Sequence, residues 1–316
     1  MKQYFGIDIG GTAVKLGIVD ETGKVLCKGE QSVNFDGYQT PVLDTVRKAA
    51  KEFLTAQAIP VESLSGIGVS ATGQIDSRKG IVAGTCGNFP NYIGSPIKAA
   101  LEQDFGLPVT VANDANCMTL GEVWVGGAQG YTDVIGVTLG TGVGGGIIAN
   151  GELVRGVHFT AGEYSFVNTN ADEWDAPAKT MACQCSTSNL LKWYRARKAL
   201  PEDAPLDGRS FFAAANAGEP EALEVLRRFC HAVAVQIYNL TVLLDVEKVA
   251  IGGGISKQPL LLESLRSAYN GLYASRAGQA YMEGLPRCQI VPCAFSSEAN
   301  QVGVAAAYFE AMQKKC

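Results

Sequence analysis

Short apolar runs, each broken by a glycine-rich turn, occur twice along the chain at a fixed spacing. The first run leads into the turn Gly10-Gly11-Thr12, and another apolar run follows directly. The same arrangement recurs 130 residues later, where the turn is Gly140-Thr141-Gly142. Short apolar runs bounded by turn residues are typical of buried strands. The repeated strand–turn–strand unit therefore predicts two similar domains.

Helical periodicity and further buried strands alternate along the rest of the chain, which predicts an α/β fold. The expected helices are 41–57, 96–105, 114–123, 187–198, 210–217, 220–244, 259–273 and about 298 to the C-terminus. The expected strands after the first hairpin are 66–70, 109–112, 246–251 and 289–291, and the segment 162–179 reads as irregular. We expect a smaller domain of residues 1–112 plus 298–316 and a larger one of residues 113–297.

Composition narrows the functional classes. Hydrophobic residues make up 47% of the 316-residue chain, which is ample for two packed cores. The net charge of −5 argues against nonspecific nucleic-acid binding, which requires a basic face. The sequence has no apolar run that could span a bilayer and no signal-peptide pattern at its start. Nine cysteines, an odd number, indicate free thiols and predict a cytoplasmic location.

The two glycine turns are candidate phosphate sites. Glycines in such turns leave backbone N–H groups exposed, and these groups bind anions. Two turns facing one cleft could hold a polyphosphate from both sides. Taken alone, Gly140–Gly146 is equally compatible with a glycine-rich hairpin bend. A strand follows the glycines, so the motif is not a Rossmann fingerprint, and the sequence contains no P-loop.

Two carboxylates lie at the ends of predicted strands. Asp8 lies in the first glycine turn and is a candidate Mg²⁺ ligand, directly or through water; the alternative is an aspartate that caps backbone N–H groups. Asp114 follows Asn113 at a strand-to-helix junction, where it could accept the proton of a substrate hydroxyl. The alternative for this pair is an ordinary helix N-cap.

A third glycine-rich segment, Gly252-Gly253-Gly254, follows a predicted buried strand. It could let a flat nucleotide base approach the backbone, or could be a turn that begins a helix.

Candidates for other metals are few. His231 lies within a long apolar helix, where a core or surface role is typical. His158 lies in a loop and could contact substrate. Cys183 and Cys185 form one Cys-x-Cys pair without a second pair, which is a weak metal signal.

The motifs, taken in order and with their spacing, resemble those of a known protein family over essentially the whole chain. The motifs are Asp8–Thr12 with Lys15, Ser70–Asp76, Asn88–Tyr92, Asn113–Asn116 with Glu122, Leu139–Gly146, Ala161–Glu163 and Ile251–Ile255. Together they resemble sugar kinases of the actin-like ATPase superfamily, and more closely the ROK family (repressor, open reading frame, kinase). The resemblance implies two duplicated actin-like, ribonuclease H-like domains around a central nucleotide and sugar cleft.

The resemblance also implies roles for individual residues. Asp114 would be the general base for transfer of the ATP γ-phosphate to the 6-hydroxyl of a hexose or β-glucoside, with Asp8 at the Mg²⁺·ATP end. Nucleotide and phosphate contacts would come from Gly10, Gly11, Thr12, Lys15, Gly140, Thr141, Gly142, Gly252, Gly253 and Gly254. Sugar contacts would come from Gly73, Asn88, Asn113, Asp114 and Glu163. The implied cofactors are ATP and Mg²⁺, the implied partner is a small sugar, and a homodimer is expected.

One departure from the family pattern concerns zinc. Members with a structural zinc carry Glu-x-Gly-His followed by Cys-x-Cys-Gly-x-x-Gly-Cys-x-Glu. Here Phe166 replaces the histidine, Leu190 replaces the third cysteine and Lys192 replaces the final glutamate. One thiolate pair cannot complete a tetrahedral site, so we expect no zinc. The departures favour the branch that includes β-glucoside kinases, in which a substituent at C1 must fit.

Two other functions stay open at this point. An N-acetylmannosamine kinase would differ only in its sugar. A sugar-sensing regulator without catalysis would need a DNA-binding domain ahead of the first glycine turn, and Asp8 lies only eight residues from the start of the sequence. We therefore expect a kinase that binds neither nucleic acid nor membrane.

Overall fold

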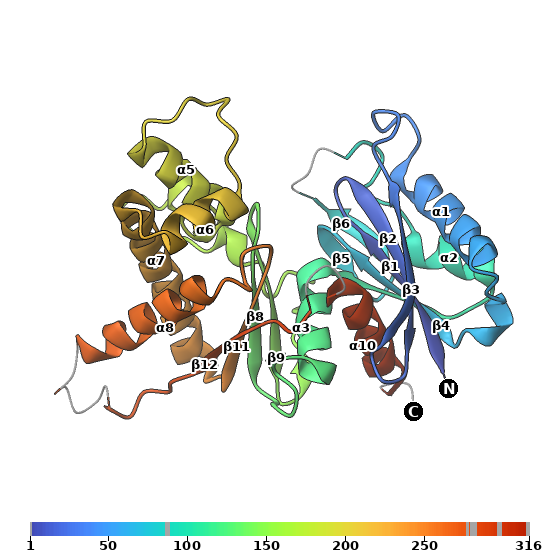
Figure 1. Ribbon diagram of the computed structural model, residues 1–316. Coiled ribbons are helices and arrows are strands. Elements are labelled where there is room, and N and C mark those ends of the chain that lie inside the picture. The colour runs from blue at the N-terminus through green and yellow to red at the C-terminus, as the bar shows by residue number, and fades with distance from the viewer. Residues whose placement is uncertain (1, 86–88, 276–277, 279–282, 296–298, 314–316) are drawn as a thin grey trace. The chain divides into compact units, whose positions relative to one another are not determined.

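The computed structural model describes residues 2–85, 89–275, 278, 283–295 and 299–313 (Figure 1). The chain forms two compact units. The first contains Met1–Gly130, Leu153–Ala161 and Ser297–Cys316, and the second contains Tyr131–Glu152 and Gly162–Ser296. Each carries one five-stranded sheet.

The first unit is built on a sheet with the strand order β3-β2-β1-β4-β7. Its strands are β1 (Gln3–Ile9), β2 (Ala13–Asp20), β3 (Val25–Ser32), β4 (Gly66–Ala71) and β7 (Val109–Asn113). The first three are antiparallel neighbours, whereas β4 pairs parallel with both β1 and β7. The carboxyl ends of β1, β4 and β7 therefore lie at one edge, which is where sites in such sheets form.

Alternation along β1 directs its side chains to two different helix layers. Phe5 stacks on Phe53 of α1 (Val42–Ala56), with ring centroids 5.7 Å apart. Gly6 faces α10 (Ala299–Gln313), where an added Cβ would lie 3.1 Å from a methyl group of Val304. Figure 1 shows α1 and α2 (Ile97–Phe105) on one face of the sheet, and α3 (Asp114–Val125) and α10 on the other.

Helix α3 lies in the first unit, although the sequence placed it at the start of the second domain. It packs against α10. The segment Leu153–Ala161 also belongs to the first unit. The expected boundary near Asn113 thus differs from the observed division, because α3 has its packing partner at the far end of the chain.

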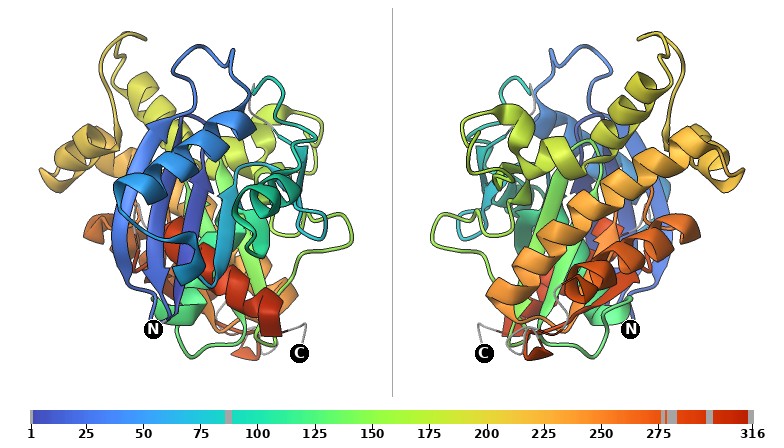
Figure 2. Two further views of the ribbon diagram at one scale, coloured as in Figure 1. Left: turned by 90° about the vertical axis from the view of Figure 1, so that its right-hand side faces the viewer. Right: turned by 90° about the vertical axis from the view of Figure 1, so that its left-hand side faces the viewer.

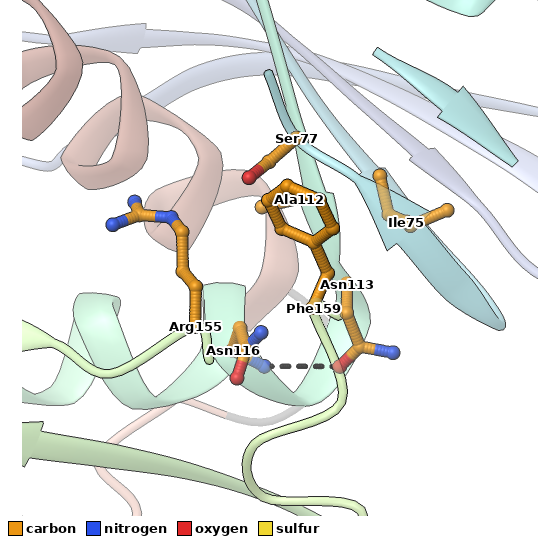
Figure 3. A pocket seen from close by; sticks show the side chains of 7 residues that line it. All are labelled: Ile75, Ser77, Ala112, Asn113, Asn116, Arg155 and Phe159. Atoms are coloured by element: carbon orange, nitrogen blue, oxygen red, sulfur yellow. Dashed lines mark hydrogen bonds between the residues drawn. The ribbon is translucent and has the colours of Figure 1, made fainter. Parts of the chain in front are cut away.

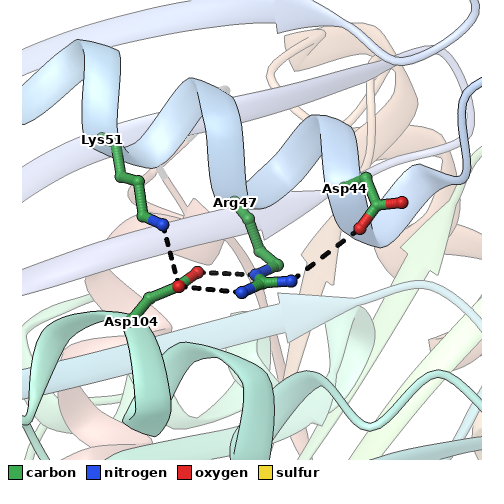
Figure 4. A network of polar contacts seen from close by, with 4 residues as sticks. All are labelled: Asp44, Arg47, Lys51 and Asp104. Atoms are coloured by element: carbon green, nitrogen blue, oxygen red, sulfur yellow. Dashed lines mark hydrogen bonds and ion pairs between the residues drawn. The ribbon is translucent and has the colours of Figure 1, made fainter.

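An ion-pair network joins α1 to α2 (Figure 4). Arg47 donates two hydrogen bonds to the Asp104 carboxylate, at 2.6 Å from Nε and 2.8 Å from Nη2. Lys51 Nζ donates a third, at 2.8 Å. The Asp104 side chain is only 8% exposed. The hydrogen bond and charge of Arg47, together with Lys51, hold the pKa of Asp104 well below its usual range.

The second unit repeats the architecture of the first. Its sheet has the order β10-β9-β8-β11-β12, formed by β8 (Val134–Leu139), β9 (Val143–Ala149), β10 (Glu152–Leu153), β11 (Lys248–Gly252) and β12 (Gln289–Pro292). β8 and β9 form an antiparallel hairpin, and β11 pairs parallel with β8 and β12. Gly136 pairs with Gly146 as Gly6 pairs with Gly17. The predicted α/β fold with a duplicated hairpin is confirmed.

Helices complete the second unit. They are α4 (Met181–Cys185), α5 (Thr187–Arg197), α6 (Gly208–Asn216), α7 (Pro220–Leu244) and α8 (Pro259–Ala274). Figure 2 shows α7 and α8 side by side. Phe229 of α7 and Leu265 of α8 belong to the same buried cluster as Val137 of β8. Among the residues described, no helix has both the length and the apolar character needed to cross a membrane.

Candidate active site

The first glycine turn is held from three sides. Gly10 N–H donates to Ala13 O at 2.9 Å, which closes the bend between β1 and β2. The Tyr38 hydroxyl donates to Gly11 O at 2.6 Å. An added Cβ on Gly11 would lie 3.1 Å from the ring of Phe89. Thr12 is exposed at the tip of the turn, where its hydroxyl can reach a ligand. These contacts fix the turn before any phosphate binds.

Asp8 is buried at the end of β1. Its Oδ1 accepts hydrogen bonds from Ser70 Oγ at 2.8 Å and from Asn300 Nδ2 at 3.0 Å. Burial raises the pKa of Asp8, and the two donors and the charge of Lys15 oppose that rise. Lys15 is the cross-strand partner of Asp8 on β2.

Asp8 is suited to a magnesium site that is completed by a ligand. Mg²⁺ is commonly bound through one or two carboxylates together with substrate phosphates. Among the described residues, no three His, Cys, Asp or Glu side chains lie close enough to hold a metal by themselves. A fixed, buried carboxylate beside a glycine turn fits a cation that arrives with the nucleotide.

Asn113 and Asp114 have different local roles at the junction of β7 and α3. Asn113 is the N-cap, and its Oδ1 accepts from the backbone N–H groups of Ala115 at 2.9 Å and Asn116 at 3.2 Å. Its Nδ2 donates to Gly73 O at 2.9 Å. Asp114 is the first residue of the helix and is half-buried. Its Oδ1 also accepts from Ala115 N–H, at 2.8 Å, so Asn113 supplies the N-cap and Asp114 shares one of its two donors.

The turn that contains Gly73 requires glycine. Its φ is +98°, and an added Cβ would overlap the carbonyl oxygen of Gly84. The close approach follows from a small hairpin of β5 (Gln74–Asp76) and β6 (Ile81–Gly84), whose strands the sequence analysis did not predict. Asn88, the other expected sugar contact nearby, lies outside the described residues.

A water-sized pocket of about 10 Å³ adjoins this junction (Figure 3). It is lined by Ile75, Ser77, Ala112, Asn113, Asn116, Arg155 and Phe159. Arg155 and Phe159 come from the segment that returns to the first unit, and Gln74 Nε2 holds that segment by donating to His158 O at 2.8 Å. Sequence reasoning assigned no role to Arg155, because no local pattern joined it to Asn113.

The second glycine turn resembles the first in its construction. Gly140 N–H donates to Gly142 O at 3.0 Å, and Thr187 N–H donates to Gly140 O at 2.9 Å. Ser165 Oγ accepts from Val143 N–H at 3.1 Å and lies 3.2 Å from where a Cβ of Gly142 would be. Thr141 is exposed at the tip, as Thr12 is in the first turn.

The expected adenosine segment lies against the same strand end. Gly253 has a φ of +96°, and an added Cβ would lie 2.8 Å from Leu139 N and overlap Leu139 O. Gly254 is open, with nothing within 4 Å of its Cβ position. The second unit therefore brings Gly140–Gly142 and Gly252–Gly254 together. Glu163, also in this unit, is half-buried, and burial raises the pKa of its carboxyl group.

Comparison with known proteins identifies the family. The sequence model of the ROK family matches residues 4–312 of this chain. The chain belongs to the ROK family. It is 33% identical over 262 residues to a β-glucoside kinase of Listeria innocua, covering 82% of this chain and 85% of that protein. A glucokinase of Halalkalibacterium halodurans is 32% identical over 271 residues, covering 81% of each chain.

A solved structure gives the same result. The ROK glucokinase of Streptomyces griseus, in complex with glucose and AMPPNP, matches with a TM-score of 0.77 and 28% identity, covering 96% of this chain and 98% of that one. The family and the actin-like fold predicted from the sequence are confirmed. These relatives bear the names of sugar kinases, which agrees with the expected enzyme class, a phosphotransferase acting on a sugar hydroxyl.

The positions at which this ROK chain departs from the zinc pattern do not resemble a metal site. Phe166 and Lys192 are exposed, and Leu190 is buried in the core of the second unit. Cys183 is exposed whereas Cys185 is buried, and burial raises the pKa of the Cys185 thiol to about 12. Cys183 and Cys185 are thus the two cysteines that remain of the pattern, and one pair cannot complete a tetrahedral site. The absence of zinc stays a prediction.

Proposed function

We propose that this ROK protein is an ATP-dependent kinase that transfers the γ-phosphate to the 6-hydroxyl of a hexose or β-glucoside. The observation that carries the proposal is the position of the half-buried Asp114 carboxylate at the start of α3, next to the N-cap Asn113. Asn113 is the N-cap and accepts from the N–H groups of Ala115 and Asn116, whereas Asp114 shares only the Ala115 N–H, through its Oδ1 at 2.8 Å. A carboxylate at that position can accept the proton of an attacking hydroxyl.

The other residues would bind and orient the substrates. Asn113 and Gly73, joined by a hydrogen bond of 2.9 Å, would present fixed polar groups to sugar hydroxyls, with Asn88 and Glu163 as further contacts. Buried polar groups of this kind discriminate between hydroxyl patterns, because a missing partner leaves them unpaired. Magnesium would supply charge neutralisation at the phosphates, and Asp8 is the residue that would hold it.

Both glycine turns would contact phosphate. Each presents backbone N–H groups and an exposed threonine, Thr12 in the first and Thr141 in the second. Lys15, half-buried beside Asp8, would add positive charge at the first turn. The open space at the Cβ position of Gly254 would leave room for the adenine or ribose. In a chain with net charge −5, such local donors are the means by which an anionic nucleotide can be held.

A β-glucoside is the substrate class that we favour. Phe166 and Lys192, which stand where zinc-containing ROK members carry a histidine and a glutamate, are exposed, and their positions would leave room for a substituent at C1 of the sugar. The β-glucoside kinase of Listeria innocua is among the relatives with 33% identity, which supports the same choice. A homodimer in the cytoplasm remains our expectation, and light scattering of the purified protein tests the dimer.

The test is a substrate panel with a base variant. ADP release would be measured with Mg·ATP and glucose, mannose, N-acetylglucosamine, N-acetylmannosamine, cellobiose or an aryl β-glucoside. We expect turnover on cellobiose or the aryl glucoside, and a loss of at least about 100-fold in kcat in Asp114→Asn, the lower range for a general base. Asp44→Asn, the same change at a side chain 57% exposed on α1, is the control and should keep wild-type kcat.

Each other outcome has a defined meaning. A preference for N-acetylmannosamine would replace the β-glucoside with a 2-acetamido sugar. Turnover that survives in Asp114→Asn would remove Asp114 as the base. No turnover with any sugar, combined with sugar binding by calorimetry, would favour a sensor without catalysis.

A further inference from the structure

Tyr92 lies in the core of the first unit, in a cluster of aromatic rings that supports the first glycine turn. Its ring contacts Phe89 edge to face at a centroid distance of 5.5 Å, and Phe89 contacts Tyr38 in the same way at 5.9 Å. Phe89 also packs against Gly11. The Tyr92 side chain is 2% exposed. Its ring is therefore fixed in place by neighbours that belong to the site.

The hydroxyl of Tyr92 lacks the partner that its burial calls for. Within the described part of the chain, the oxygen is shielded from solvent and makes no hydrogen bond. Tyr308, also buried in this unit, donates to Ser65 O at 2.7 Å, and Tyr38 donates to Gly11 O at 2.6 Å. An unpaired buried hydroxyl destabilises the state that contains it. A hydrogen bond formed in another state of the protein would remove that cost.

Two carboxylates of the site lie within electrostatic range of this hydroxyl. Burial and then the charges of Asp114 and Asp8 raise the pKa of Tyr92. Burial and the same two charges also raise the pKa of Cys117 on α3, so the thiol shares this environment. Two cations belong to the same surroundings, because the charge of Lys15 lowers the pKa of Asp8 and that of Arg155 lowers the pKa of Cys117. Asp114 has the larger effect of the two carboxylates on Tyr92.

We propose that Tyr92 is a positioning residue for Asp114, whose carboxylate receives a hydrogen bond from the Tyr92 hydroxyl when the sugar is bound. The inference rests on the proposed function, in which Asp114 is the base. A bound sugar displaces water from the carboxylate and so removes hydrogen-bond donors from it. A nearby hydroxyl without a partner can replace one of those donors and restrict the carboxylate to the orientation that faces the sugar hydroxyl. The proton stays on Tyr92, and no bond is broken.

The test removes only the hydroxyl, in Tyr92→Phe, and uses Tyr308→Phe as the matched control. With no bond lost in the free enzyme, Tyr92→Phe should melt at or above the wild-type temperature. Its kcat should fall about tenfold or more, with the KM for Mg·ATP within twofold of wild type. The acidic limb of the kcat profile should move to higher pH by about half a unit or more, because a donor to a carboxylate favours its charged form.

Tyr308→Phe should show the reverse pattern. It loses a hydrogen bond present in the free enzyme, so its melting temperature should fall, while kcat and the acidic limb stay unchanged. The inference is overturned if Tyr92→Phe keeps kcat within twofold and an unmoved acidic limb. It is also overturned if melting temperature and kcat fall together, which indicates a purely structural role. Absence of turnover in the wild type removes the proposed function, and the inference with it.

Discussion

Gly253 and Gly254 are adjacent glycines for which the structure predicts opposite responses to the same substitution. At Gly253, alanine would have to adopt a φ of +96°, which costs an L-residue about 1–3 kcal/mol. Its Cβ would lie 2.7 Å from the carbonyl carbon and 2.8 Å from the nitrogen of Leu139, both backbone atoms at the end of β8 that have little freedom to move. Overpacking of this kind adds about 1–3 kcal/mol.

The expected destabilisation of Gly253→Ala is therefore about 2–6 kcal/mol, the sum of the two ranges. In a domain of 150–250 residues each kcal/mol lowers the melting temperature by about 2–4 °C, so the decrease should be at least about 4 °C. At Gly254 an added Cβ has no atom within 4 Å, and its φ is not in the positive range. Gly254→Ala should thus melt within about 1 °C of wild type.

Thermal unfolding of both variants without ligand, followed by kinetics with varied Mg·ATP, separates stability from binding. If the nucleotide packs on this segment, Gly254→Ala should raise the KM for ATP while leaving the melting temperature unchanged. Equal melting temperatures for Gly253→Ala and wild type would refute the steric reasoning. An unaltered KM for ATP in Gly254→Ala would remove that residue from the nucleotide site.

Three further predictions follow from other parts of the chain. Asp104→Asn should lower the free energy of unfolding by about 1.5–3 kcal/mol at pH 7, by weakening its bonds to Arg47 and Lys51. Because the pKa of Asp104 is lowered in the folded state, its contribution to the free energy of unfolding is complete above about pH 5 and declines as the pH falls below about 4. Urea unfolding should therefore give wild type and Asp104→Asn increasingly similar stabilities in acid. Asn113→Ala should cost about 1 kcal/mol as a lost N-cap and raise the KM for sugar, and an unchanged KM would exclude it as a sugar contact. Elemental analysis of tag-free protein should find less than about 0.1 zinc per chain. One zinc per chain would contradict the conclusion that Phe166 and Leu190, in place of a histidine and a cysteine, leave the zinc site incomplete.

Local signals in the sequence were enough for the longer helices, the two hairpins that contain the glycine turns, and the family. The prediction of a helix over residues 220–244 agrees with α7 at both ends, because Pro220 begins it and Asp245 ends it in a left-handed conformation. The recurrence of the glycine turn after 130 residues predicted the two similar domains. Capping by Asn113 or Asp114 was also foreseeable, since these residue types favour helix starts.

Contacts between distant parts of the chain decided the rest. Asn300 donates to Asp8 across 292 positions, and the segment Leu153–Ala161 joins the first unit. Neither has a local pattern, because both depend on which faces of the sheet and helices meet. The same holds for the unpaired hydroxyl of Tyr92, which the sequence presents only as one aromatic residue in a loop. The sequence determined the strands, the turns and the order of the motifs, whereas only tertiary packing decided which polar atoms found partners, since a hydrogen bond depends on distances between segments that sequence spacing does not fix.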